Sequence, residues 1–168
     1  MTQQEMFGGE TLAAARARVR KEMWEGGCRC PCCNRIVRVY RYRLNETMVD
    51  ALAWLAAKTE NDGWVDVPKF GKRRTVRSNQ LGTLANWGVV EQKHNTDSRK
   101  RCSGIWRATE KGRQFLRREI SLSSHVLVLN VGHEFQGFDG DPVWVDDLLP
   151  NFDYAEFMAD IPTGRPLQ

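Results

Sequence analysis

The chain has 168 residues, of which 41% are hydrophobic and 27% are charged, so it can close about one globular core and is not disordered throughout. No apolar run approaches the roughly 18 residues that a membrane-spanning helix needs. The first nine residues also lack the basic and then apolar pattern of an export signal. We therefore expect a cytoplasmic protein with no membrane partner.

The net charge of +4 conceals a change of sign along the chain. Residues 69–119 hold 14 Lys/Arg against 4 Asp/Glu, whereas residues 120–168 hold 1 against 8. Such an asymmetry predicts a polyanionic partner for the middle segment.

The first part of the chain predicts a helix, a strand and a second helix. Apolar residues recur at helical spacing from Thr11 to Glu25, with Gly26-Gly27 as a stop. Alternation over Arg35–Leu44 predicts one strand. Asn45 is a suitable N-cap for a helix that includes Met48 and Leu55.

The middle and final parts predict shorter elements. Pro68 is expected to end a strand, Gly88 to stop a helix, and Thr109 to cap a helix in which Gly112 is unfavourable. The expected elements are a strand at 63–69, a helix at 75–87, a strand at 89–93, a polar loop at 94–103, a strand at 104–108, a helix from 109 to 116, a hairpin turning at 131–133, a turn at 139–142 and a short helix within 151–158.

Four of the five cysteines lie within six residues, in the string C-x-C-P-C-C. Neighbours this close cannot pair with one another in relaxed disulfide geometry, and Cys102 is the one distant cysteine. Dense cysteine in a chain expected to be intracellular indicates metal binding or catalysis.

Three interpretations of the cysteine cluster are open, and we favour structural zinc. The C-P-x-C turn can direct two thiolates at one ion, as in zinc knuckles. Inert free thiols come second, because no second C-x-x-C or histidine pair is present, and a redox pair comes third. The expected Zn²⁺ ligands are Cys28, Cys30, Cys33 and Cys32, with Cys102, His94, His125 or His133 as alternatives for the fourth position.

The segments LGTLANWGVVE (81–91) and WRATEKGRQFL (106–116) resemble the winged-helix signature of many small regulators. Together with CPCCNRIVRVYRYRLN before them and GFDGDPVWVDDLL after them, they are similar to small phage and prophage proteins. The resemblance implies an α+β fold with a winged helix-turn-helix core, an N-terminal cysteine (zinc) knuckle and a C-terminal β-hairpin/helix appendage. We expect three parts, at residues 1–44, 45–119 and 120–168, with residues 68–74 too short for a full second helix.

In such a fold, one helix enters the major groove of double-stranded DNA while a wing loop contacts phosphates. Arg, Asn and Gln can read base edges, and the other cations would act as phosphate anchors. The candidate DNA-binding residues are Lys72, Arg73, Arg74, Arg77, Asn79, Gln80, Lys93, Arg99, Lys100 and Arg101. The alternative is an ordinary solvated charged surface.

The aromatic residues are expected mainly in the core. Trp54, Trp64, Trp87, Trp106 and Phe115 occupy positions where a winged helix packs. Tyr40 and Tyr42 alternate with arginines and could stack on single-stranded nucleic acid, although we favour half-buried strand packing.

We expect a phage or mobile-element regulator that binds double-stranded DNA and is not an enzyme, because the C-terminal carboxylates match neither a calcium loop nor a catalytic order. A homodimer is possible in such folds. The alternative function is an inhibitor that uses the winged-helix scaffold to bind a host defence or other host protein complex. A thiol-redox enzyme is a third and weaker possibility.

Overall fold

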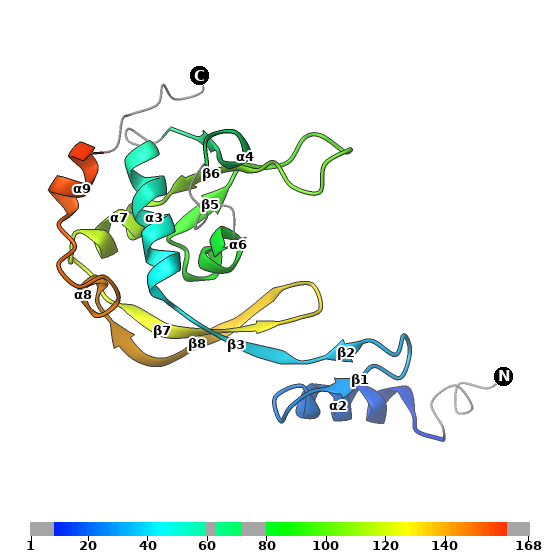
Figure 1. Cartoon of the computed structure of the whole chain (residues 1–168). Coiled ribbons are helices and arrows are strands. Elements are labelled where there is room, and N and C mark those ends of the chain that lie inside the picture. The colour runs from blue at the N-terminus through cyan, green and yellow to red at the C-terminus, as the bar shows by residue number, and fades with distance from the viewer. Residues whose placement is uncertain (1–8, 60–62, 72–79, 161–168) are drawn as a thin grey trace. The chain divides into compact units, whose positions relative to one another are not determined.

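The computed structural model describes residues 9–59, 63–71 and 80–160 and has a mixed α+β fold (Figure 1). Its strands form a two-stranded sheet and two three-stranded sheets. The helices and strands in chain order are α2 (Leu12–Glu22), β1 (Cys28–Arg29), β2 (Ile36–Val37), β3 (Val39–Arg43), α3 (Glu46–Lys58), β4 (Val65–Asp66), α4 (Val67–Phe70), α6 (Gln80–Leu84), η2 (Ala85–Trp87), β5 (Val90–Gln92), β6 (Ile105–Ala108), α7 (Glu110–Leu116), β7 (Leu122–Leu129), β8 (Glu134–Val143), α8 (Val145–Leu148) and α9 (Tyr154–Asp160).

Two compact units divide the described chain. The first takes its residues from Met1–Tyr42 and His125–Asp139, and the second from Arg43–Ser124 and Gly140–Gln168. Each unit is described by itself.

The first unit contains α2, the β1–β2 hairpin and most of the sheet ordered β3-β7-β8. The hydroxyl of Thr11 caps α2 by accepting a hydrogen bond from the Ala14 amide at 3.2 Å. Of the residues of α2, Ala15 alone is fully buried, so the helix packs through a narrow stripe. Strands β1 and β2 pair antiparallel, with Cys28 opposite Val37.

The strand predicted over 35–44 is interrupted at Arg38, because a side chain takes over the pairing there. The Arg38 amide donates to Asn130 Oδ1 at 2.8 Å, and Asn130 Nδ2 donates to the Ile36 carbonyl at 2.8 Å. Asn130 begins the β7–β8 turn, where Gly132 and His133 have positive φ. The predicted hairpin is confirmed, whereas residues 139–142, predicted as a turn, lie within β8.

The second unit is built around α3. Asn45 caps this helix by accepting a hydrogen bond from the Met48 amide at 3.0 Å, as predicted. The helix is apolar on nearly every side, which is the pattern of a central core helix. Nine of its residues are buried: Met48, Val49, Ala51, Leu52, Ala53, Trp54, Leu55, Ala56 and Ala57.

The second sheet has the order β4-β6-β5, with both pairings antiparallel. Pro68 does not simply end a strand, because it lies in the first turn of α4, which Asp66 caps. Thr109 caps α7 as predicted, accepting a hydrogen bond from the Gly112 amide at 3.2 Å. Gly112 is buried and so close to the Val89 carbonyl that a side chain there would collide with it.

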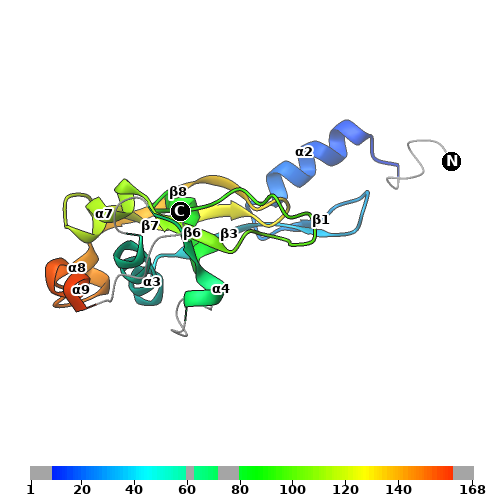
Figure 2. The same ribbon diagram turned by 90° about the horizontal axis from the view of Figure 1, so that it is seen from above.

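The core of the second unit confirms part of the aromatic prediction. Trp54, Trp87 and Phe115 are buried, and the Trp87 indole donates to the Ser123 carbonyl at 2.7 Å. Trp64 and Trp106 are only half-buried. Helices α8 and α9 pack against α3 (Figures 1 and 2). No helix among the described residues has the length and apolar character needed to span a bilayer.

Candidate functional site

The predicted basic loop joins β5 to β6 and is closed at its base by hydrogen bonds. The Lys93 amide donates to the Ile105 carbonyl at 2.9 Å, and the Ser103 hydroxyl donates to the Lys93 carbonyl at 2.6 Å. At the tip, Asn95 Nδ2 donates to the Lys100 carbonyl at 2.7 Å. The loop is therefore a structured projection that presents its cations in defined places.

All four predicted cations of this loop are exposed, namely Lys93, Arg99, Lys100 and Arg101. Arg99 is partly neutralised, because its Nε lies 3.1 Å from Asp97 Oδ1, and this hydrogen bond lowers the pKa of Asp97. The other three form no ion pair with any residue that the structure describes. Three positive charges are thus available to an anion.

Trp64 lies beside the base of the loop. The Lys93 ammonium is 6.0 Å from the centre of its ring, and the Arg107 guanidinium is 4.6 Å from it. Arg107 also forms an ion pair with Glu91 across β5 and β6. These contacts lie at the end of the sheet β4-β6-β5 from which the loop projects.

Most of the predicted major-groove residues lie outside the described residues, namely Lys72, Arg73, Arg74, Arg77 and Asn79. Gln80 is the first residue of α6 and is half-buried. The structure therefore describes the basic loop, while its role as a wing and the base-reading helix both stay predictions.

The cysteine turn lies in the first unit, between β1 and β2. The Cys30 amide donates to the Arg35 carbonyl and the Asn34 amide donates to the Cys30 carbonyl, both at 2.8 Å. Within this turn, the backbone amides of Cys33 and Cys32 donate to the Cys30 sulfur and lower the pKa of Cys30. Burial raises the pKa of Cys32, and burial together with Glu22 raises that of Cys28.

The cysteines fit a zinc site only in part. Cys30 has the amide hydrogen bonds of a thiolate ligand, but the Cys28 thiol is hydrogen-bonded to Glu22 on α2. Across the described ranges, no group of three or more His, Cys, Asp or Glu side chains is arranged to hold a metal ion. Zinc at Cys28, Cys30, Cys32 and Cys33 therefore stays a prediction.

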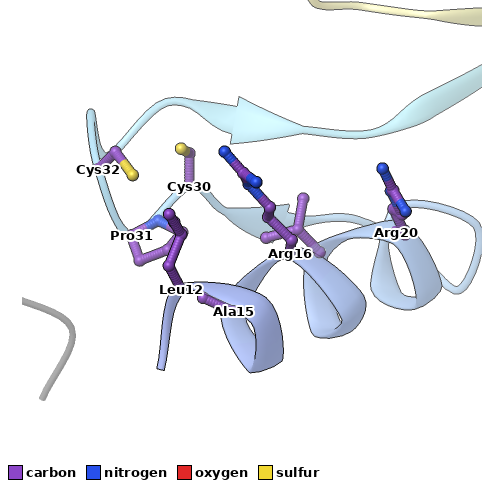
Figure 3. A pocket seen from close by; sticks show the side chains of 8 residues that line it. Leu12, Ala15, Arg16, Arg20, Cys30, Pro31 and Cys32 are labelled. Carbon is purple, nitrogen blue, oxygen red and sulfur yellow. The ribbon is translucent and has the colours of Figure 1, made fainter. Parts of the chain in front are cut away.

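A cavity of about 330 Å³ lies between α2 and the cysteine turn (Figure 3). Arg16 and Arg20 project along its helical side, while Cys30 and Cys32 border it from the turn. Arg16 also favours the thiolate of Cys32. The other residues that line the cavity are Leu12, Ala15, Val19 and Pro31.

Sequence reasoning did not single out the aromatic pair on β8. Phe135 and Phe138 are 46% and 49% exposed, and Tyr40 and Tyr42 on β3 are 39% and 37% exposed. Alternation along a strand shows that one face is apolar, but it does not show whether that face is covered.

Comparison of the chain with protein-family models, curated proteins and solved structures gave no match.

Proposed function

We propose that the chain is a nucleic-acid-binding regulator that binds double-stranded DNA through the β5–β6 loop. The observation that carries this proposal is the availability of charge on that loop. Lys93, Lys100 and Arg101 are exposed on a hydrogen-bonded projection and form no ion pair with described residues. Cations presented in this way anchor phosphates.

The order of elements in the second unit supports a winged helix as the scaffold. Helix α3, β4, α4, α6, β5, β6 and α7 follow one another, and the sheet order is β4-β6-β5. A loop between the last two strands of such a sheet is the wing. The short α4, of four residues, agrees with an abbreviated helix-turn-helix pair.

The charge of the sequence supports the same partner. Residues 69–119 have an excess of ten positive charges, and Lys72, Arg73, Arg74 and Arg77 immediately precede α6. A helix that follows four cations and a wing that carries four more match the electrostatic footprint of a DNA-binding domain.

The test is a fluorescence anisotropy titration of a labelled 20-base-pair duplex at several salt concentrations. The variant Lys100→Glu/Arg101→Glu should bind at least tenfold more weakly. Its plot of log affinity against log salt should also be shallower by about 2, because each lost phosphate contact removes roughly 0.9 from that slope.

The matched control is Arg20→Glu/Lys21→Glu on α2, which changes the net charge by the same amount on exposed residues of the first unit. It should retain duplex affinity within about threefold. Equal losses in the two double variants would show that net charge alone drives binding, and wild-type affinity of the loop variant would overturn the proposal.

A further inference from the structure

The sheet β3-β7-β8 carries exposed aromatic residues on both of its edge strands. On β3, the rings of Tyr40 and Tyr42 are stacked with centroids 6.1 Å apart. On β8, Phe135 and Phe138 meet edge to face at 4.9 Å. All four side chains are more than a third exposed, and exposed apolar surface gathered in one place is typical of a binding site.

These aromatic rings share one face of the sheet. Arg41 and Asp139 join the two edge strands through an ion pair, so their side chains lie on one face. Neighbouring residues of a strand point to opposite faces. Tyr40, Tyr42 and Phe138 therefore lie on the other face. Phe135 has the parity of Asp139, but Gly137, with a φ of 154°, interrupts the alternation before Phe138, and the Phe135 ring meets that of Phe138. We call these four residues the aromatic face.

Positive charge lies next to the aromatic face. The Arg38 guanidinium is 5.3 Å from the centre of the Tyr40 ring. Residues 26–42 include four arginines and no Asp or Glu. Arg35 and Arg38 form no ion pair within the described part of the chain.

A cavity of about 490 Å³ extends this basic surface beyond Arg38. Arg29, Arg35 and His133 line it, together with Asn130, whose side chain accepts a hydrogen bond from the Arg38 amide. The cavity therefore borders the backbone of Arg38, whose guanidinium lies over the Tyr40 ring. Flat rings beside unpaired guanidinium groups complement a ligand that has flat bases and regularly spaced phosphates.

We propose that the aromatic face binds single-stranded nucleic acid, with bases stacked on Tyr40 and Tyr42 and phosphates held by Arg38 and Arg35. Aromatic side chains accept any base, because every base has a π-face, and arginines along the strand neutralise the backbone. This site is distinct from the duplex-binding loop, since its residues belong to the first unit. The surface requires no particular sugar, so DNA and RNA are both candidate ligands.

The test measures the anisotropy of labelled 15-residue oligo-dT and oligo-U strands. Removing one stacking partner costs about 1–3 kcal/mol per base, which is roughly 5- to 150-fold in affinity. Tyr40→Ala/Tyr42→Ala should therefore weaken single-strand binding at least tenfold. Tyr40→Phe/Tyr42→Phe should restore affinity to within threefold, because it keeps the rings.

Two controls separate this proposal from the duplex proposal. Trp24→Ala removes another exposed aromatic residue of the first unit, outside the sheet, and should leave single-strand affinity unchanged. Lys100→Glu/Arg101→Glu should weaken duplex binding and spare single-strand binding. Each proposal can thus fail while the other holds.

Loss of oligo-dT or oligo-U binding in the alanine variant, with rescue by phenylalanine, supports the site, and the more strongly affected strand identifies the sugar. Equal single-strand affinity of the wild type and the folded alanine variant overturns it. Anionic lipid vesicles provide a further arm, and a tyrosine effect that is confined to vesicles also overturns it.

Discussion

Arg41 Nε lies 2.6 Å from Asp139 Oδ2, in an ion pair that spans the central strand of the sheet β3-β7-β8. Both side chains are about half exposed, so water screens their attraction. The pair shows that Arg41 and Asp139 share one face of the sheet, so that their strand neighbours Tyr40, Tyr42 and Phe138 lie on the other.

Replacing Asp139 by Asn should therefore change stability little. We expect the free energy of unfolding to fall by less than about 1 kcal/mol, as for other exposed ion pairs. Urea denaturation followed by circular dichroism measures this change, with Asp141→Asn as the control of equal charge. A loss of several kcal/mol would contradict the exposed placement of the pair.

Thr59 is a fully buried polar residue of the second unit, and several groups depend on its hydroxyl. It donates to the Leu55 carbonyl at 2.8 Å and accepts from the Ala108 amide at 3.3 Å. Arg113 reaches the same hydroxyl at 3.2 Å and also donates to the Ala56 carbonyl at 3.0 Å. Thr59 thus links the end of α3 to β6 and α7.

Thr59→Val keeps the shape of the side chain but leaves the Ala108 amide without this acceptor. We expect a loss of about 1–3 kcal/mol in the free energy of unfolding. Thr59→Ser retains the hydroxyl and should lose less than half as much. If both variants are equally destabilised in urea titrations, packing of the methyl group matters more than the hydrogen bonds.

Local signals predicted much of this fold. Asn45 and Thr109 were recognised as caps because an N-cap hydrogen bond reaches only three residues along the chain. The helix within 151–158 and the β7–β8 hairpin were also predicted from short-range pattern. Asp66 before Val67-Pro68 is the same kind of signal for α4, because proline is also favoured in the first turn of a helix and does not only end strands.

Long-range contacts explain what local pattern missed. Asn130 interrupts the strand at Arg38, although these two residues are 92 positions apart in the sequence. The basic loop could be predicted as a site because charge is visible in the sequence. Of the aromatic face, Tyr40 and Tyr42 could be named as candidates in the same way, but Phe135 and Phe138 could not, because their exposure depends on which other elements cover the sheet.

At Gly112, too, the local pattern and the long-range contacts lead to opposite expectations for a substitution. Helix propensity alone favours Ala over Gly by about 1 kcal/mol. In this structure, however, a Cβ at position 112 would meet the Val89 carbonyl and also Leu52 Cδ1, at 3.0 Å.

Gly112→Ala should therefore destabilise the protein by at least about 1 kcal/mol, because overpacking costs more than the propensity gains. Gln114→Ala, on the same helix, is the control and should change stability by less than about 0.5 kcal/mol. Thermal unfolding of the two variants compares them directly, and stabilisation by Gly112→Ala would contradict the close approach of Val89.

Cys30 should be alkylated more readily than Cys28 and Cys32. Amides of Cys33 and Cys32 lower the pKa of Cys30, while burial raises the pKa values of Cys28 and Cys32. The thiolate is the nucleophile, so a lowered pKa means a larger reactive fraction at any pH below the pKa.

Alkylation with iodoacetamide, followed by peptide mass spectrometry at pH 6.5, 7.5 and 8.5, measures this order. Modification of Cys30 should lead that of Cys28 and Cys32 at every pH, and its advantage over these two should be largest at pH 6.5. In the urea-unfolded chain the order should disappear. Faster modification of Cys28 in the folded chain would contradict the hydrogen bonding of the turn.

The same labelling tests the zinc prediction. A Zn²⁺ ion held by the turn would need the Cys30 and Cys33 thiolates and would therefore protect both from alkylation. One equivalent of Zn²⁺ should slow their modification at least fivefold, and a chelator should restore it. Cys102 lies in the β5–β6 loop of the second unit, and its alkylation rate tests whether it is the fourth ligand, because only a ligand would be protected by Zn²⁺. Equal rates of Cys30 alkylation with and without Zn²⁺ would show that the turn does not bind zinc. The cluster would then be a set of free thiols whose reactivity is controlled by the turn alone.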